Sequence, residues 1–232
     1  MRPAPRFVIA CLTLTAACHR VDVDVVVGSG VALAEQRRVT PFQALDVSGS
    51  AVVLVSRAAA PSVSVTADAN VVPVVTTTVV GGTLVVRFER PGSGGRAPTP
   101  VTVEPKVPIT IRIATPGLGR VALAGAITLE ASGLAADAFT LSAAGAAKGT
   151  LVGAAKLLTV TVSGAGKLDL GRLRAETAIV KVSGAADVTV SASSKLDVEI
   201  SGAARVGYYG NPTVARHVTG AGRVSQLGAA AP

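Results

Sequence analysis

The carboxylates between Asp169 and Glu199 are the densest group of side chains in this sequence that can act as acids, bases or calcium ligands. Clustered carboxylates bind calcium or cleave glycosidic bonds in polysaccharide-processing enzymes. Asp197 and Glu199 are two residues apart, which places them on one face of a strand. Asp169 and Asp187 hold different positions in the repeat described below, so no catalytic pair is forced together. We therefore expect no catalytic residue, no metal site and no cofactor, with a β-helix polysaccharide-processing enzyme as the alternative.

Histidines and serines offer no other catalytic arrangement. His19 and His217 lie near opposite ends of the chain, which indicates neither a histidine-rich metal site nor a Ser-His-Asp triad. We expect His217 to be a surface residue. Three serines precede successive glycine turns, and without a nearby base we expect their hydroxyls to hydrogen-bond the turn backbone. These serines are Ser163, Ser183 and Ser201.

The N-terminus resembles a bacterial export leader. Arg2 and Arg6 precede an apolar run from Phe7 to Ala17, which is shorter than the about 20 residues that span a bilayer. The sequence Leu-Thr-Ala-Ala-Cys that ends at Cys18 resembles a lipoprotein signal, whose cysteine is acylated. We predict a signal peptide over residues 1–18 and a lipid anchor on Cys18, the alternative being ordinary cleavage near Ala17. No cysteine follows Cys18, so the rest of the chain has no disulfide and no thiol nucleophile.

The composition favours strands and argues against a nucleic-acid partner. Hydrophobic residues make up 49% of the 232, mostly small or β-branched, and only six residues are aromatic. The formal net charge of +8 suits a protein that rests against anionic envelope polymers or lipids, although dispersed basic residues also serve solubility. Basic residues without interleaved aromatics lack the stacking platforms of nucleic-acid binders.

A regular repeat of glycine-centred turns dominates the second half of the chain. Apolar residues lie two positions before and four positions after these glycines, with polar residues between them, as expected for two strands joined at a corner. A unit of 18–20 residues cannot bury a hydrophobic core alone, so successive units must stack on one another. The sequence thus predicts an all-β fold, a parallel and, by the crossover rule, right-handed β-helix or β-solenoid with rungs of 18–20 residues. The turn glycines are Gly125, Gly145, Gly164, Gly184, Gly202 and Gly220.

The repeat also predicts which charged side chains are neighbours. Stacking places Lys181 beside Glu199, and it places Lys167, Asp187 and Arg205 in one outward column. Exposed pairs of this kind contribute about 0.2–1 kcal/mol each, so they help to set the register more than they stabilise the fold.

The remaining boundaries follow from composition. We expect residues 19–38 to form an N-terminal linker, residues 39–228 the β-solenoid domain and residues 229–232 a tail. Residues 91–108 contain five prolines and three glycines. Since proline cannot donate to an inner ladder, we predict that this stretch is an exposed insertion.

From about Val39 to Leu227, the sequence resembles the head (GIN) domain family of bacterial auto-transporter adhesins. An opening strand, Phe42 to Leu45, and the segment Val63 to Asp68 match that family's pattern. Its serial Ser-Gly turns are matched by the turns at Gly164, Gly184 and Gly202, and its ending by Tyr209 to Pro212. The resemblance implies a surface or periplasmic interaction module.

The sequence departs from that family at the acidic position that closes each turn. Lys167, Arg205 and Arg223 occupy this position, and only Asp187 keeps the acid. We therefore expect no cation site at these turns.

Together these features predict an exported, non-enzymatic protein of the cell envelope. We expect a lipid anchor on Cys18 to attach it to the membrane and its repetitive surface to serve adhesion or scaffolding. The expected partner is a protein or glycan ligand, and not a nucleic acid. Besides the polysaccharide-processing enzyme, a periplasmic sensor or accessory domain is a second alternative to adhesion or scaffolding.

Overall fold

The described part of the protein is all-β, as the sequence predicts. A computed structural model describes residues 24–92 and 97–229. In these residues the strands join into one sheet, accompanied by a short 3-10 turn, η1 (Val72–Val74). No helix in this part of the chain has the length and apolar character needed to cross a membrane. The strands are β1 (Asp24–Val27), β2 (Ala32–Arg37), β3 (Ala44–Arg57), β4 (Ser62–Asp68), β5 (Val75–Val80), β6 (Thr83–Arg90), β7 (Thr99–Glu104), β8 (Thr110–Thr115), β9 (Arg120–Gly202), β10 (Arg205–Tyr209), β11 (Thr213–Thr219) and β12 (Arg223–Gly228).

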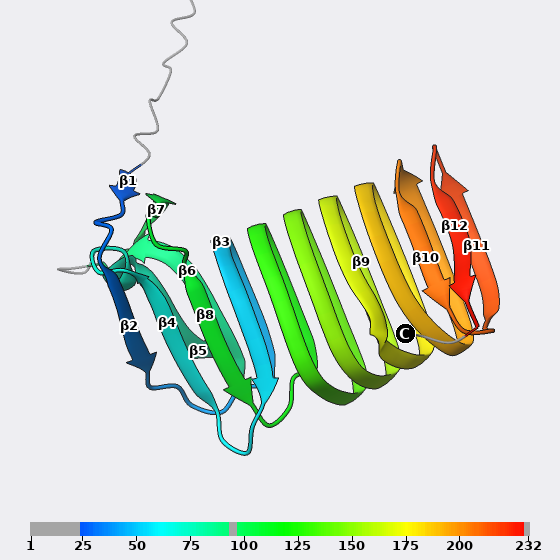
Figure 1. Ribbon diagram of the computed structural model, residues 1–232, viewed down its shortest axis with the longest axis horizontal. Helices are drawn as coiled ribbons and strands as arrows, with labels where there is room; N and C mark the ends of the chain where they lie inside the picture. Colours follow the sequence, from blue (N-terminus) through cyan, green and yellow to red (C-terminus); the bar gives the residue numbers. More distant parts are fainter. Residues whose placement is uncertain (1–23, 93–96, 230–232) are drawn as a thin grey trace, which may run out of the picture.

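Parallel pairing builds the sheet from β3 to the C-terminal strands. β9 is extended chain that winds back beside itself several times, so its windings lie in a row between β3 and β10 (Figure 1). β10 pairs in parallel with β9 on one side and with β12 on the other. Arg205 lies opposite Asp187, 18 residues earlier, and Arg223 lies opposite Arg205, so the register advances by the same interval twice.

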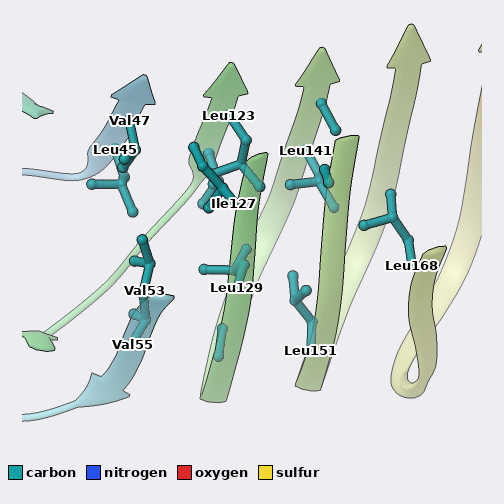
Figure 2. Close-up of a cluster of buried hydrophobic side chains, with 14 of the residues drawn as sticks. Leu45, Val47, Val53, Val55, Leu123, Ile127, Leu129, Leu141, Leu151 and Leu168 are labelled. Atoms are coloured by element: carbon teal, nitrogen blue, oxygen red, sulfur yellow. The ribbon is translucent and has the colours of Figure 1, made fainter. Parts of the chain in front are cut away.

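Two columns of apolar side chains fill the interior of the curled sheet. The column two positions before the turn glycines is buried from Leu123 to Ile200, with exposed fractions of at most 4%. Its last member, Val218, is 38% exposed because, among the described residues, β11 has a neighbouring strand only on the β9 side. Figure 2 shows Leu45 and Val53 of β3 in the same interior as Leu123 and Leu129 of β9. The alternation read from the sequence therefore places the core correctly.

The turn glycines stack directly on one another. All six have positive φ angles, between 95° and 128°. A Cβ on Gly202 would lie 2.5 Å from the carbonyl oxygen of Gly184, so no larger residue fits without moving the backbone. Gly49 of β3 heads the column, opposite Gly125. Its sequence distance from Gly125 is unlike the repeat interval, so the pattern of spacings does not reveal it.

The expected linker at residues 19–38 is wrong where the structure describes it, because residues 24–37 contain two strands. β1 pairs in parallel with β7, and β2 pairs antiparallel with β4. The polar side chains from Glu35 onward are typical of a loop. They are tolerated in β2 because, among the described residues, this strand has a partner on one side only and its residues are nearly all exposed.

The expected insertion at residues 91–108 also contains a strand, β7. It lies beside β1, and its first residues pair antiparallel with β6, Thr99 opposite Arg90 and Pro100 opposite Glu89. β7 lies between β1 and β6, but its pairing with β1 begins at Val101, so within the described residues Pro100 has a strand partner on the β6 side alone and a proline is tolerated there. Residues 93–96 lie outside the described part of the chain.

Candidate functional site

A groove of about 780 Å³ crosses the outer face of the sheet, which is the face opposite the buried columns. We call it the arginine groove. It extends from β2 across β4, β8 and β3 to the first windings of β9. Its polar lining residues are Gln36, Ser56, Ser62, Ser64, Arg112, Glu130, Ser132, Thr150 and Arg172.

Strand alternation aims these side chains outward. Ile111 and Ile113 are buried in the core, so Arg112 between them must face the opposite side. In the same way Val53 and Val55 of β3 are buried and the residues next to them point into the groove. The apolar pattern that forms the core thus positions the groove lining as well.

The sheet register arranges the lining in rows across the strands. Ser64 of β4 lies opposite Arg112 of β8, Arg112 lies opposite Leu54 of β3, and Leu54 lies opposite Glu130 of β9. Neighbouring strands are about 4.8 Å apart, so this row presents one side chain per strand at even intervals.

A second row beside the first is rich in hydroxyl groups. Ser62 of β4 lies opposite Ala114 of β8, which in turn lies opposite Ser56 of β3. Ser132 continues the row on β9, since the preceding residue Ala131 lies opposite Val55. The floor of the groove therefore combines one charged row with one row of small hydroxyl side chains.

Arg112, Glu130 and Arg172 are exposed, and none of them forms an ion pair within the described residues. Each guanidinium is therefore available to an external ligand. Arginine presents its N–H groups as a planar fork that can donate two parallel hydrogen bonds to one carboxylate.

A smaller hollow of about 220 Å³ adjoins the arginine groove. The two share Glu130 and Thr150, so together they form one depression. The hollow adds the side chains of Lys148, Lys167 and Asp169 to the lining. Within the combined depression basic side chains therefore outnumber acidic ones.

The predicted pairing of Lys181 with Glu199 and of Asp187 with Arg205 is confirmed. Lys181 Nζ lies 3.0 Å from a carboxylate oxygen of Glu199. Arg205 lies opposite Asp187, with 3.8 Å between guanidinium nitrogen and carboxylate oxygen. All four side chains are more than half exposed, so these pairs contribute little to stability.

A second groove, of about 950 Å³, crosses windings of β9 on another part of the surface and is lined mainly by alanine. Two of its four charged side chains pair with each other, with Lys156 Nζ 2.8 Å from a carboxylate oxygen of Asp137. The hydrogen bond to Lys156 lowers the pKa of the Asp137 carboxyl, and the same bond raises the pKa of Lys156. This ion pair leaves Arg174 and Glu176 to a ligand in the alanine groove, against Arg112, Glu130 and Arg172 in the arginine groove.

The four carboxylates that the sequence analysis considers for catalysis, Asp169, Asp187, Asp197 and Glu199, are all exposed. Asp197 and Glu199 share one outward face, whereas Asp169 accepts a hydrogen bond of 3.0 Å from the backbone N–H of Gly171. In residues 24–92 and 97–229 no group of three His, Cys, Asp or Glu side chains is arranged to hold a metal ion. His217 is exposed, as predicted, and lies opposite Glu199.

The serine column is exposed, and in the described part of the chain none of its hydroxyls bonds to the turn backbone, so the expected hydrogen bonds are wrong. An exposed hydroxyl satisfies its hydrogen bonds with water and needs no backbone partner. The three serines are Ser163, Ser183 and Ser201. The proposed lipidation site Cys18, like His19, lies outside the described residues.

One carboxylate, Asp68, is fully buried and has a structural role that the sequence did not reveal. It accepts hydrogen bonds from the backbone N–H groups of Gly30 (2.6 Å), Lys106 (3.0 Å) and Val107 (3.0 Å). Burial raises the pKa of Asp68, but the backbone donors outweigh burial and hold the pKa below the ordinary value of 3.8. Asp68 thereby ties two loops to the end of β4.

Comparison with known proteins shows what the chain is similar to. A family model described as "Putative auto-transporter adhesin, head GIN domain" matches residues 41–212. A putative adhesin from Bacteroides fragilis superposes with a TM-score of 0.65 at 17% identity, covering 87% of this chain and all of the other. A putative lipid binding protein from Parabacteroides distasonis reaches 0.50 at 17% identity, covering 88% and 100%. At this identity the structures demonstrate a shared fold. None of the curated proteins matches the chain.

Proposed function

The chain belongs to the head GIN domain family of putative auto-transporter adhesins, and on that premise we propose that it is a non-enzymatic binding protein of the cell envelope. Its role is adhesion or scaffolding through a surface that repeats along the stacked strands. The arginine groove is the observation that carries this proposal, since it offers rows of hydroxyl side chains and of charged side chains that form no ion pair with another described residue.

We propose that the architecture behind this surface is a right-handed parallel β-solenoid with rungs of 18–20 residues. The constant interval of 18 residues between β9, β10 and β12 supports this description. The stacked glycines support it as well, since each lies against the preceding one. Right-handedness follows from the general preference of parallel crossovers.

A lipid anchor on Cys18 is the proposed attachment to the membrane. The apolar leader that ends in Leu-Thr-Ala-Ala-Cys supports it. The described fold begins at Asp24, six residues after Cys18, so such an anchor would hold the domain close to the lipid surface. Metabolic labelling with a radioactive fatty acid tests this proposal, because label should enter the parent protein and be absent from Cys18→Ala.

Protease shaving of intact cells tests the adhesion role. An epitope inserted between Gly92 and Ala97 lies outside β6 and β7, so it should leave both strands in place. Cleavage on intact cells, with a periplasmic marker protein untouched, is expected for an adhesin. Protection until the cells are lysed would contradict adhesion and would favour a periplasmic scaffold, sensor or accessory domain.

A further inference from the structure

We propose that the arginine groove binds an acidic oligosaccharide that lies across the strands. This inference rests on the proposed function, because it names the ligand class of an envelope binding surface. It is argued from the direction of the rows, the chemistry of the lining and the balance of charge.

The geometry of the groove favours a ligand with its own short repeat. Arg112 and Glu130 lie in one row with a single strand between them, and neighbouring strands are about 4.8 Å apart. A ligand that crosses the strands therefore meets a new side chain at each even step. A chain of pyranose units presents hydroxyl and carboxylate groups at regular steps of comparable length.

Backbone pairing argues against an extended peptide in this groove. Peptides that bind sheets commonly add a strand at an edge and use main-chain hydrogen bonds. β3 and β8, which cross the middle of the groove, each have a paired strand on both sides. Recognition must therefore come from side chains, and a ligand that carries many hydroxyls can use a row of serines.

The lining chemistry points to an acidic sugar. No aromatic side chain from residues 24–92 or 97–229 lines the groove, so these residues give it none of the ring faces on which neutral sugars commonly stack. Arg112 and Arg172 provide two forks for carboxylates, and Glu130 can accept hydrogen bonds from sugar hydroxyls. Lys148 and Lys167 extend the basic lining into the adjoining hollow.

Isothermal titration calorimetry with a galacturonic acid hexamer tests the proposal. The hexamer is compared with its methyl ester, which keeps the hydroxyls and the length but removes the negative charges. We expect the acid to bind and the ester to bind about tenfold or more weakly, because charge-assisted hydrogen bonds are lost. The double variant Arg112→Ala/Arg172→Ala should weaken binding of the acid by a similar factor.

Matched controls separate the groove from general surface charge. Arg216→Ala removes an exposed arginine on β11, away from the groove, and should leave binding unchanged. Arg112→Lys keeps the charge without the fork and should weaken binding, which also covers the case in which the alanine variant fails to fold. A glutamate hexamer should bind weakly, because it carries the charges without the hydroxyls.

Several results would overturn the inference. Equal losses for Arg216→Ala and the double variant would mean that only net charge is sensed, and equal binding of the glutamate hexamer would exclude a sugar-specific site. If the acid hexamer does not bind although shaving shows the protein on the cell surface, the ligand class is wrong and the proposed function stands. Unsaturated product from the hexamer would instead identify the polysaccharide-processing alternative.

Discussion

Replacing Gly164 with alanine is expected to destabilise the stacked strands by about 2–6 kcal/mol. The φ of Gly164 is +128°, and holding a residue with a Cβ in such a region costs about 1–3 kcal/mol. The new Cβ would also lie 2.5 Å from the carbonyl oxygen and 3.0 Å from the nitrogen of Gly145, in the neighbouring winding. Relieving this contact means moving backbone, and overpacking of this kind costs about another 1–3 kcal/mol. Domains are typically stable by about 5–15 kcal/mol, so the loss is large.

Two matched variants separate the two costs. Gly82 has a φ of +73°, but no atom lies within 4 Å of the position that a Cβ would take, so Gly82→Ala should carry only the backbone cost, about 1–2 kcal/mol. Gly117 has neither a positive φ nor a close neighbour, so Gly117→Ala should be neutral or stabilising by about 0.4–1 kcal/mol.

Urea unfolding followed by far-ultraviolet circular dichroism measures all three variants against the parent. The expected order of free energies of unfolding is Gly117→Ala highest, then Gly82→Ala, then Gly164→Ala. If Gly164→Ala and Gly82→Ala lose the same stability, the close approach of Gly164 to Gly145 has no energetic consequence. The reasoning about stacked glycines would then be refuted.

Three further predictions concern the core, the buried carboxylate and a surface pair. Val182→Asp should unfold the protein in thermal melts, since burying an unpaired charge costs several kcal/mol, whereas Ser183→Asp on the exposed face should melt like the parent. The pKa of Asp68 is lower in the folded protein than its ordinary value of 3.8. The Asp68 carboxylate therefore stabilises the fold fully at pH values above 3.8, and this stabilisation is lost as the pH falls through the pKa of the folded protein. Urea midpoints measured against pH should therefore fall in acid for the parent and fall less for Asp68→Asn; parallel curves would contradict this role. A double-mutant cycle on Lys181 and Glu199 should give a coupling of about 0.2–1 kcal/mol that shrinks in salt, and a salt-insensitive coupling would contradict an exposed ion pair.

Much of the fold could be predicted because the second half of the chain repeats one local pattern. Alternation of apolar and polar residues around each glycine indicates which side chains are buried, and Leu123, Val182 and Ile200 are buried accordingly. The regular interval also predicts the neighbours of Lys181 and Arg205, since a repeated register carries each position onto its equivalent.

The N-terminal part could not be predicted to the same degree, because its strands pair without a constant interval. β2 carries polar residues and β7 a proline, both typical of loops. β2 tolerates them because it lies at the edge of the described sheet, and β7 because Pro100 precedes the residues that pair with β1. Nothing in the local pattern of either segment reveals which strand will lie beside it. Asp68 likewise finds its donors in loops that are distant along the chain.

The strand alternation, the glycine turns and the inward columns can be predicted from the amino-acid order, because each depends on residues that are close along the chain. The stacking of Gly49 on Gly125, and the meeting of Arg112, Ser64 and Glu130 in one groove, can be seen only in the folded protein. These residues come from strands far apart in the sequence, and their register depends on how the antiparallel N-terminal strands join the parallel windings. A one-residue shift of that register would turn each lining side chain toward the core, so the groove exists only in the assembled sheet.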